Sequence, residues 1–369
     1  MAFAACYAIM MGGFAVSEKK RSYVADILKG ICIILVVINH FHWQNDEGLL
    51  PIFPYLIGMA VPIFMILSGY VYSIAYESRA ITSIRQVYSI DYIIDKLARY
   101  TIPFVIVYIM ELIAFYRLGN QYGMGEIIWT FMNGGFGFGS YYFPIMIQFI
   151  FVFPFIYFLI KRFEFSGLLL CGLFNALFEI LQRAYFVSEM QYRLLIFRYL
   201  LLIAFGCYLY LRTKPLKRVV GIVSMLCGGL FLWAVCYGGY VPPIINHWTR
   251  TSFVAALYIM PIIGLVLGSE KCSRMRCKPL EYLGKASYHI FLMQMFFYQF
   301  LAYPIEVRLA DVSSYIRLLI SIVVCICCGI LFYVIETRIT RILLSAIHHF
   351  NLQRAFNRAL EYINVHVSR

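Results

Sequence analysis

Charged residues are scarce in this 369-residue chain: Asp, Glu, Lys and Arg together make up 13% of it, against about a quarter of a typical soluble domain. Hydrophobic residues make up 62% of the chain, and its mean hydropathy is +0.79. Apolar runs long enough to cross a bilayer recur along the whole length, without the alternating character of barrel strands. The sequence therefore predicts an all-α protein, a polytopic bundle of transmembrane helices with both termini in the cytoplasm.

Long polar stretches are also absent, so no soluble domain separates from the membrane domain. Ten apolar runs are candidate spans: 24–43, 52–76, 97–117, 141–160, 167–181, 194–211, 218–237, 252–268, 286–303 and 317–335. The predicted parts are a cytoplasmic N-terminal segment (1–21), a ten-helix membrane domain (22–340) and a basic, amphipathic cytoplasmic tail (341–369). A basic tail that only sets the topology explains this last segment equally well. No basic region precedes the first apolar residues, which argues against a cleaved signal peptide.

Basic residues are distributed unevenly over the loops. Of the 31 Lys and Arg, 23 fall in segments on the predicted cytoplasmic side. The exoplasmic loops hold six: Arg117, Arg183, Arg193, Arg250, Arg308 and Arg317. This asymmetry follows the positive-inside rule and accounts for the net charge of +13 without any nucleic-acid partner, since no basic soluble face exists. We expect an integral protein of a plasma membrane, the inner membrane in a bacterium, in contact with the lipid bilayer.

Metal-binding and disulfide patterns are missing as well. Most of the eleven cysteines lie within apolar runs, and Cys272 and Cys277 lack the second pair that a zinc site needs. We expect the cysteines to act as small apolar side chains, with no metal site.

Two ionisable residues bracket the apolar run KGICIILVVINH, residues 29–40. Eleven residues advance a helix by three turns plus about 20°, so Lys29 and His40 share one face, about 16 Å apart along the axis. Asp26 lies one turn before Lys29 and is placed to pair with it. Taken singly, Lys29 can extend to the membrane surface and His40 can bond to a neighbouring helix. Taken together, they indicate a polar pathway with an ionisable group near each end.

Further charges fall in or at the ends of spans: Glu111, Glu179, Arg198 and Glu336. A structural ion pair would explain each one alone, whereas a transporter or a transmembrane enzyme would explain the set. A proton-coupled exporter of a glycan precursor or a small molecule is thus an alternative function. Such exporters normally contain structural repeats, and we detect none.

Five stretches, in order, resemble the membrane acyltransferase 3 family. DILKGICIILVVINHF resembles its first helix, which typically carries a basic residue, usually Arg, eleven positions before a histidine. The other four are VPIFMILSGYVYS (61–73), YYFPIMIQFIFVFP (141–154), GKASYHIFLMQMFF (284–297) and FYVIETRITR (332–341). The region around Arg198 is a looser match. Two positions depart from the usual pattern: Lys29 offers a point charge instead of a planar guanidinium, and Gln294 stands where many members have His.

The resemblance implies an O-acyltransferase. Its donor would be a cytoplasmic acyl-CoA, commonly acetyl-CoA, used as a substrate with no permanently bound cofactor. Its acceptor would be a hydroxyl of a surface or lipid-linked glycan. A sugar hydroxyl needs a base to attack a thioester, and histidine titrates near neutral pH.

Roles for individual residues follow from the resemblance and the chemistry. His40 is the predicted base or covalent acyl carrier, and Asn39 and Ser68 orient its ring or stabilise the oxyanion. Ser68 with Gly69 is also typical of a close helix contact. The predicted donor-binding residues are Lys29 and Arg198. The predicted acceptor-binding residues are Trp43, Asp46, Glu47, Tyr142, Gln148, Glu179 and Gln294. An interfacial aromatic belt would also explain the aromatic residues in the exoplasmic loops FHWQNDE (41–47) and NGGFGFGSYY (133–142).

Overall fold

The computed structural model describes residues 22–43, 53–213 and 217–349, and every regular element in these ranges is helical. The predicted helical bundle is therefore confirmed. The long α-helices are α2 (Tyr23–His40), α3 (Ala60–Ser78), α5 (Ile90–Arg117), α7 (Tyr142–Ala184), α9 (Leu200–Leu211), α10 (Arg218–Cys236), α12 (Ile259–Gly268), α14 (Lys278–Phe296) and α16 (Ser314–His349). Shorter α-helices are α4 (Ile84–Val87), α6 (Met124–Met132), α8 (Glu189–Arg193), α11 (Phe253–Ala256), α13 (Glu270–Ser273) and α15 (Ala302–Arg308). The 3-10 and π segments are η3 (Phe53–Ile57), η4 (Ile196–Tyr199), η5 (Thr249–Thr251) and η6 (Phe297–Leu301).

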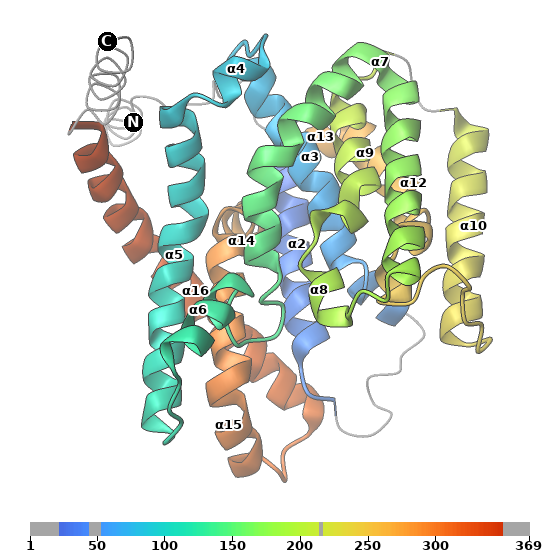
Figure 1. The fold of residues 1–369 in the computed structure, drawn as a ribbon. Helices are drawn as coiled ribbons and strands as arrows, with labels where there is room; N and C mark the ends of the chain where they lie inside the picture. Colours follow the sequence, from blue (N-terminus) through green and yellow to red (C-terminus); the bar gives the residue numbers. More distant parts are fainter. Residues whose placement is uncertain (1–21, 44–52, 214–216, 350–369) are drawn as a thin grey trace.

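Within the described residues, seven helices are long and apolar enough to cross a membrane, or eight if a pair bent by 55°, Thr249–Ala256 and Ile259–Gly268, forms one span. Helix α7 covers two of the predicted runs, because its backbone leaves helical geometry at Glu164 (φ 43°, ψ −113°) and then returns alongside itself (Figure 1). The run at 194–211 corresponds to a shorter apolar helix, Ile196–Leu211. The protein is thus an integral membrane bundle. The count of ten spans and the side of each terminus stay predictions. The amphipathic tail also stays a prediction, since residues 350–369 lie outside the described part.

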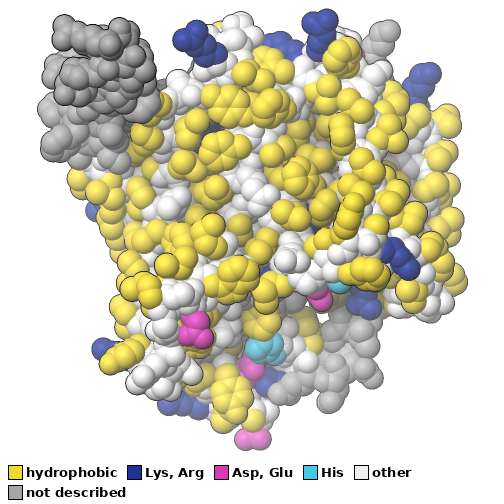
Figure 2. Space-filling model, in the orientation of Figure 1, with side chains coloured by type: hydrophobic (Ala, Val, Ile, Leu, Met, Phe, Trp, Pro, Cys, Tyr) yellow, Lys and Arg dark blue, Asp and Glu magenta, His cyan; other side chains and the backbone are white. Residues whose placement is uncertain are grey.

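The short elements fall into two groups. Figure 1 shows α4, the turn of α7 and α13 in the upper part of the view, and α6, α8 and α15 in its lower half. These two groups are the segments that the basic residues assign to opposite membrane faces. Figure 2 shows hydrophobic side chains across the middle of one face, Lys and Arg above them, and His with charges of both signs below. Helix α2 runs from the first group toward the second (Figure 1). Its last residue, His40, therefore lies on the side of the bundle that carries α6, α8 and α15.

Glycines bring α2 and α14 into backbone contact. A Cβ atom added to Gly30 would overlap the backbone oxygen of Leu280, and one added to Gly284 would overlap that of Asp26. Larger side chains at either position would push the two helices apart. Small residues at helix contacts are typical of membrane bundles, where close backbone approach supplies much of the packing energy.

Helices α3 and α9 form a second contact of the same kind. A Cβ on Gly69 would overlap the oxygen of Ile203, and one on Gly206 would overlap that of Ile66. The hydroxyl of Ser68 donates to the oxygen of Phe64 one turn earlier, at 2.8 Å. Gly69 thus lies in a close helix contact, whereas Ser68 bonds within its own helix.

Replacing Gly206 by Ala should destabilise the bundle, because the new methyl group meets backbone and not a movable side chain. Overpacking of this kind typically costs about 1–3 kcal/mol. The matched control is Gly229→Ala in α10, where the nearest neighbour of the new Cβ is a side-chain carbon of Tyr258 at 3.7 Å. Thermal unfolding of the two purified variants should show a lower midpoint for Gly206→Ala only. Equal midpoints would contradict the α3–α9 contact.

Candidate active site

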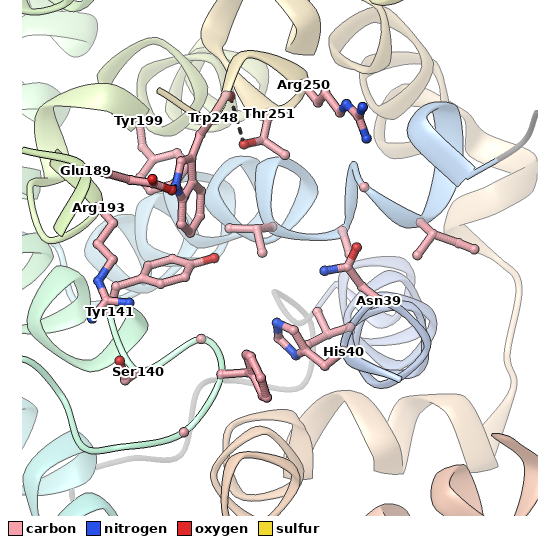
Figure 3. Close-up of a pocket in the computed structure, with 18 of the residues that line it drawn as sticks. Asn39, His40, Ser140, Tyr141, Glu189, Arg193, Tyr199, Trp248, Arg250 and Thr251 are labelled. Carbon is pink, nitrogen blue, oxygen red and sulfur yellow. Dashed lines mark hydrogen bonds between the residues drawn. The ribbon is translucent and has the colours of Figure 1, made fainter. Parts of the chain in front are cut away.

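A cavity of about 670 Å³ opens between helices at the His40 end of the bundle (Figure 3). This volume lies within the usual range for small-molecule sites. Its walls come from the end of α2, the start of α3, the loop before α7, helix α8 and the segment before α11. The polar and aromatic lining residues include Asn39, His40, Ser140, Tyr141, Glu189, Arg193, Tyr199, Trp248, Thr249, Arg250, Thr251 and Gln299. Segments far apart in the sequence thus meet around one histidine.

His40 is the last residue of α2, and its ring points into the cavity (Figure 3). Its Nδ1 lies 3.0 Å from Oε1 of Gln294 on α14. An amide oxygen only accepts hydrogen bonds, so with this oxygen facing the ring Nδ1 carries the proton and Nε2 keeps its lone pair. The ring also stacks on Phe138, with centroids 6.2 Å apart and planes at 25°. In a neutral ring, this arrangement leaves on Nε2 the lone pair that a base requires.

The glycine-rich loop before α7 forms the wall beside His40. Gly139 has φ +87°, and a Cβ there would lie 3.3 Å from Cε1 of His40 and 3.0 Å from the ring of Phe291. Glu111 of α5 is 1% exposed, and its Oε2 accepts a hydrogen bond from the backbone N–H of Phe136 at 3.2 Å. A buried carboxylate thus holds the loop, and the missing side chain at Gly139 leaves room for the imidazole.

Aromatic residues form the wall opposite His40 (Figure 3). Trp248 has a left-handed backbone (φ 52°), and its indole N–H donates to Oε1 of Glu189 at 2.7 Å. Its ring packs edge-on against Tyr141, with the ring centroids 4.8 Å apart. Arg198 also lies against Trp248, with its guanidinium carbon 4.5 Å from a Trp248 ring centre. Aromatic faces beside polar groups suit the apolar faces and hydroxyls of a sugar.

Of the predicted site residues, the structure brings Asn39 and His40 together at the cavity. Lys29 lies toward the other end of α2, and its Nζ is 3.4 Å from Oδ1 of Asp26, which confirms the expected pair. Ser68 faces Phe64, as described above, and is not among the residues that line the cavity.

The described members of the predicted acceptor set do not line the cavity. Tyr142 lines a void of about 20 Å³ that shares Val36 and Val61 with the main cavity. Gln294 is fully buried behind His40. The indole N–H of Trp43 donates to the oxygen of Ile38 at 3.3 Å. Asp46 and Glu47 lie outside the described residues.

Two more of the predicted acceptor residues, Gln148 and Glu179, support the segment of chain that carries α8 and η4. The side chain of Gln148 donates to the oxygen of Leu194 at 2.6 Å and accepts from the N–H of Ile196 at 3.1 Å. Glu179 is fully buried and accepts a hydrogen bond from the hydroxyl of Tyr192 at 2.8 Å. Burial raises the pKa of Tyr192, which keeps this hydroxyl protonated. Both contacts hold α8 and η4 where they contribute Arg193 and Tyr199 to the cavity.

Sequence reasoning missed four prominent lining residues: Tyr141, Arg193, Trp248 and Arg250. Tyr141 is one position from the predicted Tyr142, and the start of α7 decides which of the two faces the cavity. Arg193 and Arg250 belong to the small group of cations on the predicted exoplasmic side, and that rarity was a usable signal.

A buried histidine–carboxyl contact lies away from the cavity. Nε2 of His289 is 2.6 Å from Oε2 of Glu336, and both side chains are less than a tenth exposed. This pair joins α14 to α16, so both residues have a structural role. Among the described residues, no group of three His, Cys, Asp or Glu side chains is placed to hold a metal ion.

Comparison with curated proteins and with solved structures gave no match. A family model did match: the acyltransferase 3 model, described as an acyltransferase domain, aligns with residues 23–334, most of the chain and nearly all of the described bundle. A histidine-centred cavity at one end of a helical membrane bundle is consistent with that match. The chain is an integral membrane protein that belongs to the acyltransferase 3 family.

Proposed function

We propose that this acyltransferase moves an acyl group, most simply acetyl, from cytoplasmic acyl-CoA to a hydroxyl of a surface or lipid-linked glycan, within a plasma membrane. The observation that carries the proposal is the His40 imidazole, which faces the cavity while Gln294 holds its Nδ1. Membership of the family supports acyl transfer as the reaction class.

His40 supplies the proton chemistry. In the direct route, Nε2 removes the proton of the acceptor hydroxyl as that oxygen attacks the thioester carbon. The C–S bond then breaks, CoA leaves and takes up the proton, and an ester forms. In the covalent route, Nε2 itself attacks the thioester, the C–S bond breaks, and CoA leaves as the thiolate. The acceptor hydroxyl then attacks the acyl-imidazole, the C–N bond breaks as the ester forms, and the proton of the hydroxyl balances the charge of the thiolate. Both routes need the Nε2 lone pair in the cavity. Asn39, exposed on the cavity wall, supplies an amide for the oxyanion or the acceptor.

The donor approaches from the Lys29 end of α2. Lys29 is about 16 Å from His40 along the helix, and a cationic ammonium suits the donor phosphates. The void beside Tyr142 is lined by Ile33 of α2. Ile33 lies about one turn closer to Lys29 than Val36, which lines the main cavity. Arg198 lies behind the cavity wall at the other end, beside Trp248. We therefore assign the donor phosphates to Lys29.

His40→Ala should abolish nearly all acyl transfer while the protein still folds. Loss of a general base costs about 10²- to 10⁴-fold in rate. His42→Ala is the matched control, because His42 contacts Glu306 and Phe138 and does not line the cavity. Transfer of labelled acetyl from acetyl-CoA to membrane glycan measures both variants. A well-expressed His40→Ala protein that keeps more than about a tenth of the wild-type rate would rule out this assignment.

Gln294→Leu should lower kcat about 10- to 100-fold and leave the acceptor KM nearly unchanged, because it leaves the buried Nδ1–H of His40 without its acceptor. Gln294→Glu should retain much more activity, since its carboxylate also accepts from Nδ1. Steady-state kinetics of the two variants, with acceptor and donor varied separately, provide the measurement. Equal losses in both variants would show that Gln294 acts through packing alone.

Lys29→Ala should raise the KM for acyl-CoA, whereas Lys29→Arg should retain activity, because the phosphates require the positive charge. Neither change should alter the KM for the acceptor. Donor kinetics in native membranes test this directly. Wild-type donor kinetics in Lys29→Ala would leave Lys29 with a purely interfacial role.

A further inference from the structure

Two arginines line the cavity without an acidic partner in the described part of the chain. Arg193 is half-buried, and its Nε is buried without a hydrogen-bond acceptor. Arg250 is exposed on the cavity wall. Glu189 is the lining residue with a carboxylate, and one of its oxygens already accepts the indole N–H of Trp248 at 2.7 Å. Figure 3 places Arg193 and Arg250 on either side of Trp248.

A third arginine stands directly behind this wall. Arg198 is 2% exposed, and its guanidinium lies 4.9, 4.6 and 4.5 Å from the ring centres of Tyr192, Tyr199 and Trp248. Its Nη2 donates to the hydroxyl of Thr251 at 3.2 Å, while its Nη1 is buried without a partner. Aromatic faces stabilise this cation. Glu179, which accepts the Tyr192 hydroxyl, interacts with Arg198 electrostatically, but no carboxylate of the described residues lies within ion-pair distance of the guanidinium.

These charges give the cavity wall an excess of positive charge. Tyr199, Trp248 and Thr251 line the cavity, so the charge of Arg198 acts on it through a single layer of side chains. A buried cation is costly in a membrane protein, and it is usually retained where it serves a substrate. Guanidinium groups bind carboxylates and phosphates through paired hydrogen bonds. A cavity built only for neutral hydroxyl groups would not require three arginines.

We propose that the acceptor is acidic: it carries a carboxylate or phosphate that binds at Arg193 and Arg250, while one of its hydroxyls lies at His40. This inference rests on the proposed acyl transfer and adds the charge class of the acceptor. Arg198 is a positioning residue here, since it stabilises the anion through the field behind Trp248 and Thr251 without touching it. A phospholipid headgroup offers the same anionic chemistry, so the test must separate the two sources.

The test measures binding in the full-length His40→Ala protein, so its result does not depend on turnover. The probes are matched monosaccharide pairs: glucose with glucuronate, galactose with galacturonate, and glucose with glucose 6-phosphate. The acidic member of at least one pair should bind about tenfold tighter or better, as expected for a charged hydrogen-bonded pair. Arg193→Gln combined with Arg250→Gln should remove this preference. Arg117→Gln combined with Arg308→Gln, exposed arginines outside the cavity, should leave it unchanged.

A parallel arm uses nanodiscs of zwitterionic lipid with or without anionic lipid. If the proposal holds, the acidic sugar binds in zwitterionic discs and the Arg193/Arg250 variant loses that binding. Equal binding within every pair, or an acidic preference that survives in the variant, overturns the proposal. Loss of anionic-lipid association in the variant with unchanged sugar binding also overturns it, in favour of a headgroup. Failure of acyl transfer with the acidic preference intact would count against the proposed function alone.

Discussion

The close approach of α2 and α14 determines the geometry of the site. Gly30 and Gly284 let the two backbones touch near one end of the bundle. From this contact the helices run about three turns in the same direction, which places Gln294 opposite His40 with a 3.0 Å hydrogen bond. The imidazole therefore owes its orientation to a packing contact well removed from it. In a bilayer, where lipid competes equally for apolar surface, such small-residue contacts are an effective way to set helix positions.

Ionisable groups inside the bundle have different surroundings. Glu336 pairs with His289, Lys29 pairs with Asp26, and Arg198 lies among aromatic rings. These neighbours offset part of the cost of placing charge in the low dielectric of a membrane, although Nη1 of Arg198 has no hydrogen-bond partner. They also separate the charges by role: the His289–Glu336 pair joins two helices, whereas Arg198 borders the cavity.

Much of the fold was predictable because hydrophobic length and basic loops are local signals. The ten predicted runs all fall on helical elements, and the return of α7 at Glu164 accounts for two of them. The cavity was only partly predictable. Asn39 and His40 were identified because they belong to one helix with a recognisable spacing. Tyr142 was chosen instead of Tyr141, because the direction in which a residue at a helix start points depends on where that helix begins.

The sequence by itself determined the class of the protein, the shared face of Lys29 and His40, and the family. The first two depend on residues close together in the chain, and the family depends on the order of several short stretches, each of which is local. The tertiary structure decided which distant residues meet that face. Gln294 faces His40, and Arg193 and Arg250 share a cavity with it, only because the helices pack with particular partners and in a particular register. No local pattern encodes that register, since it results from backbone contacts between segments hundreds of residues apart.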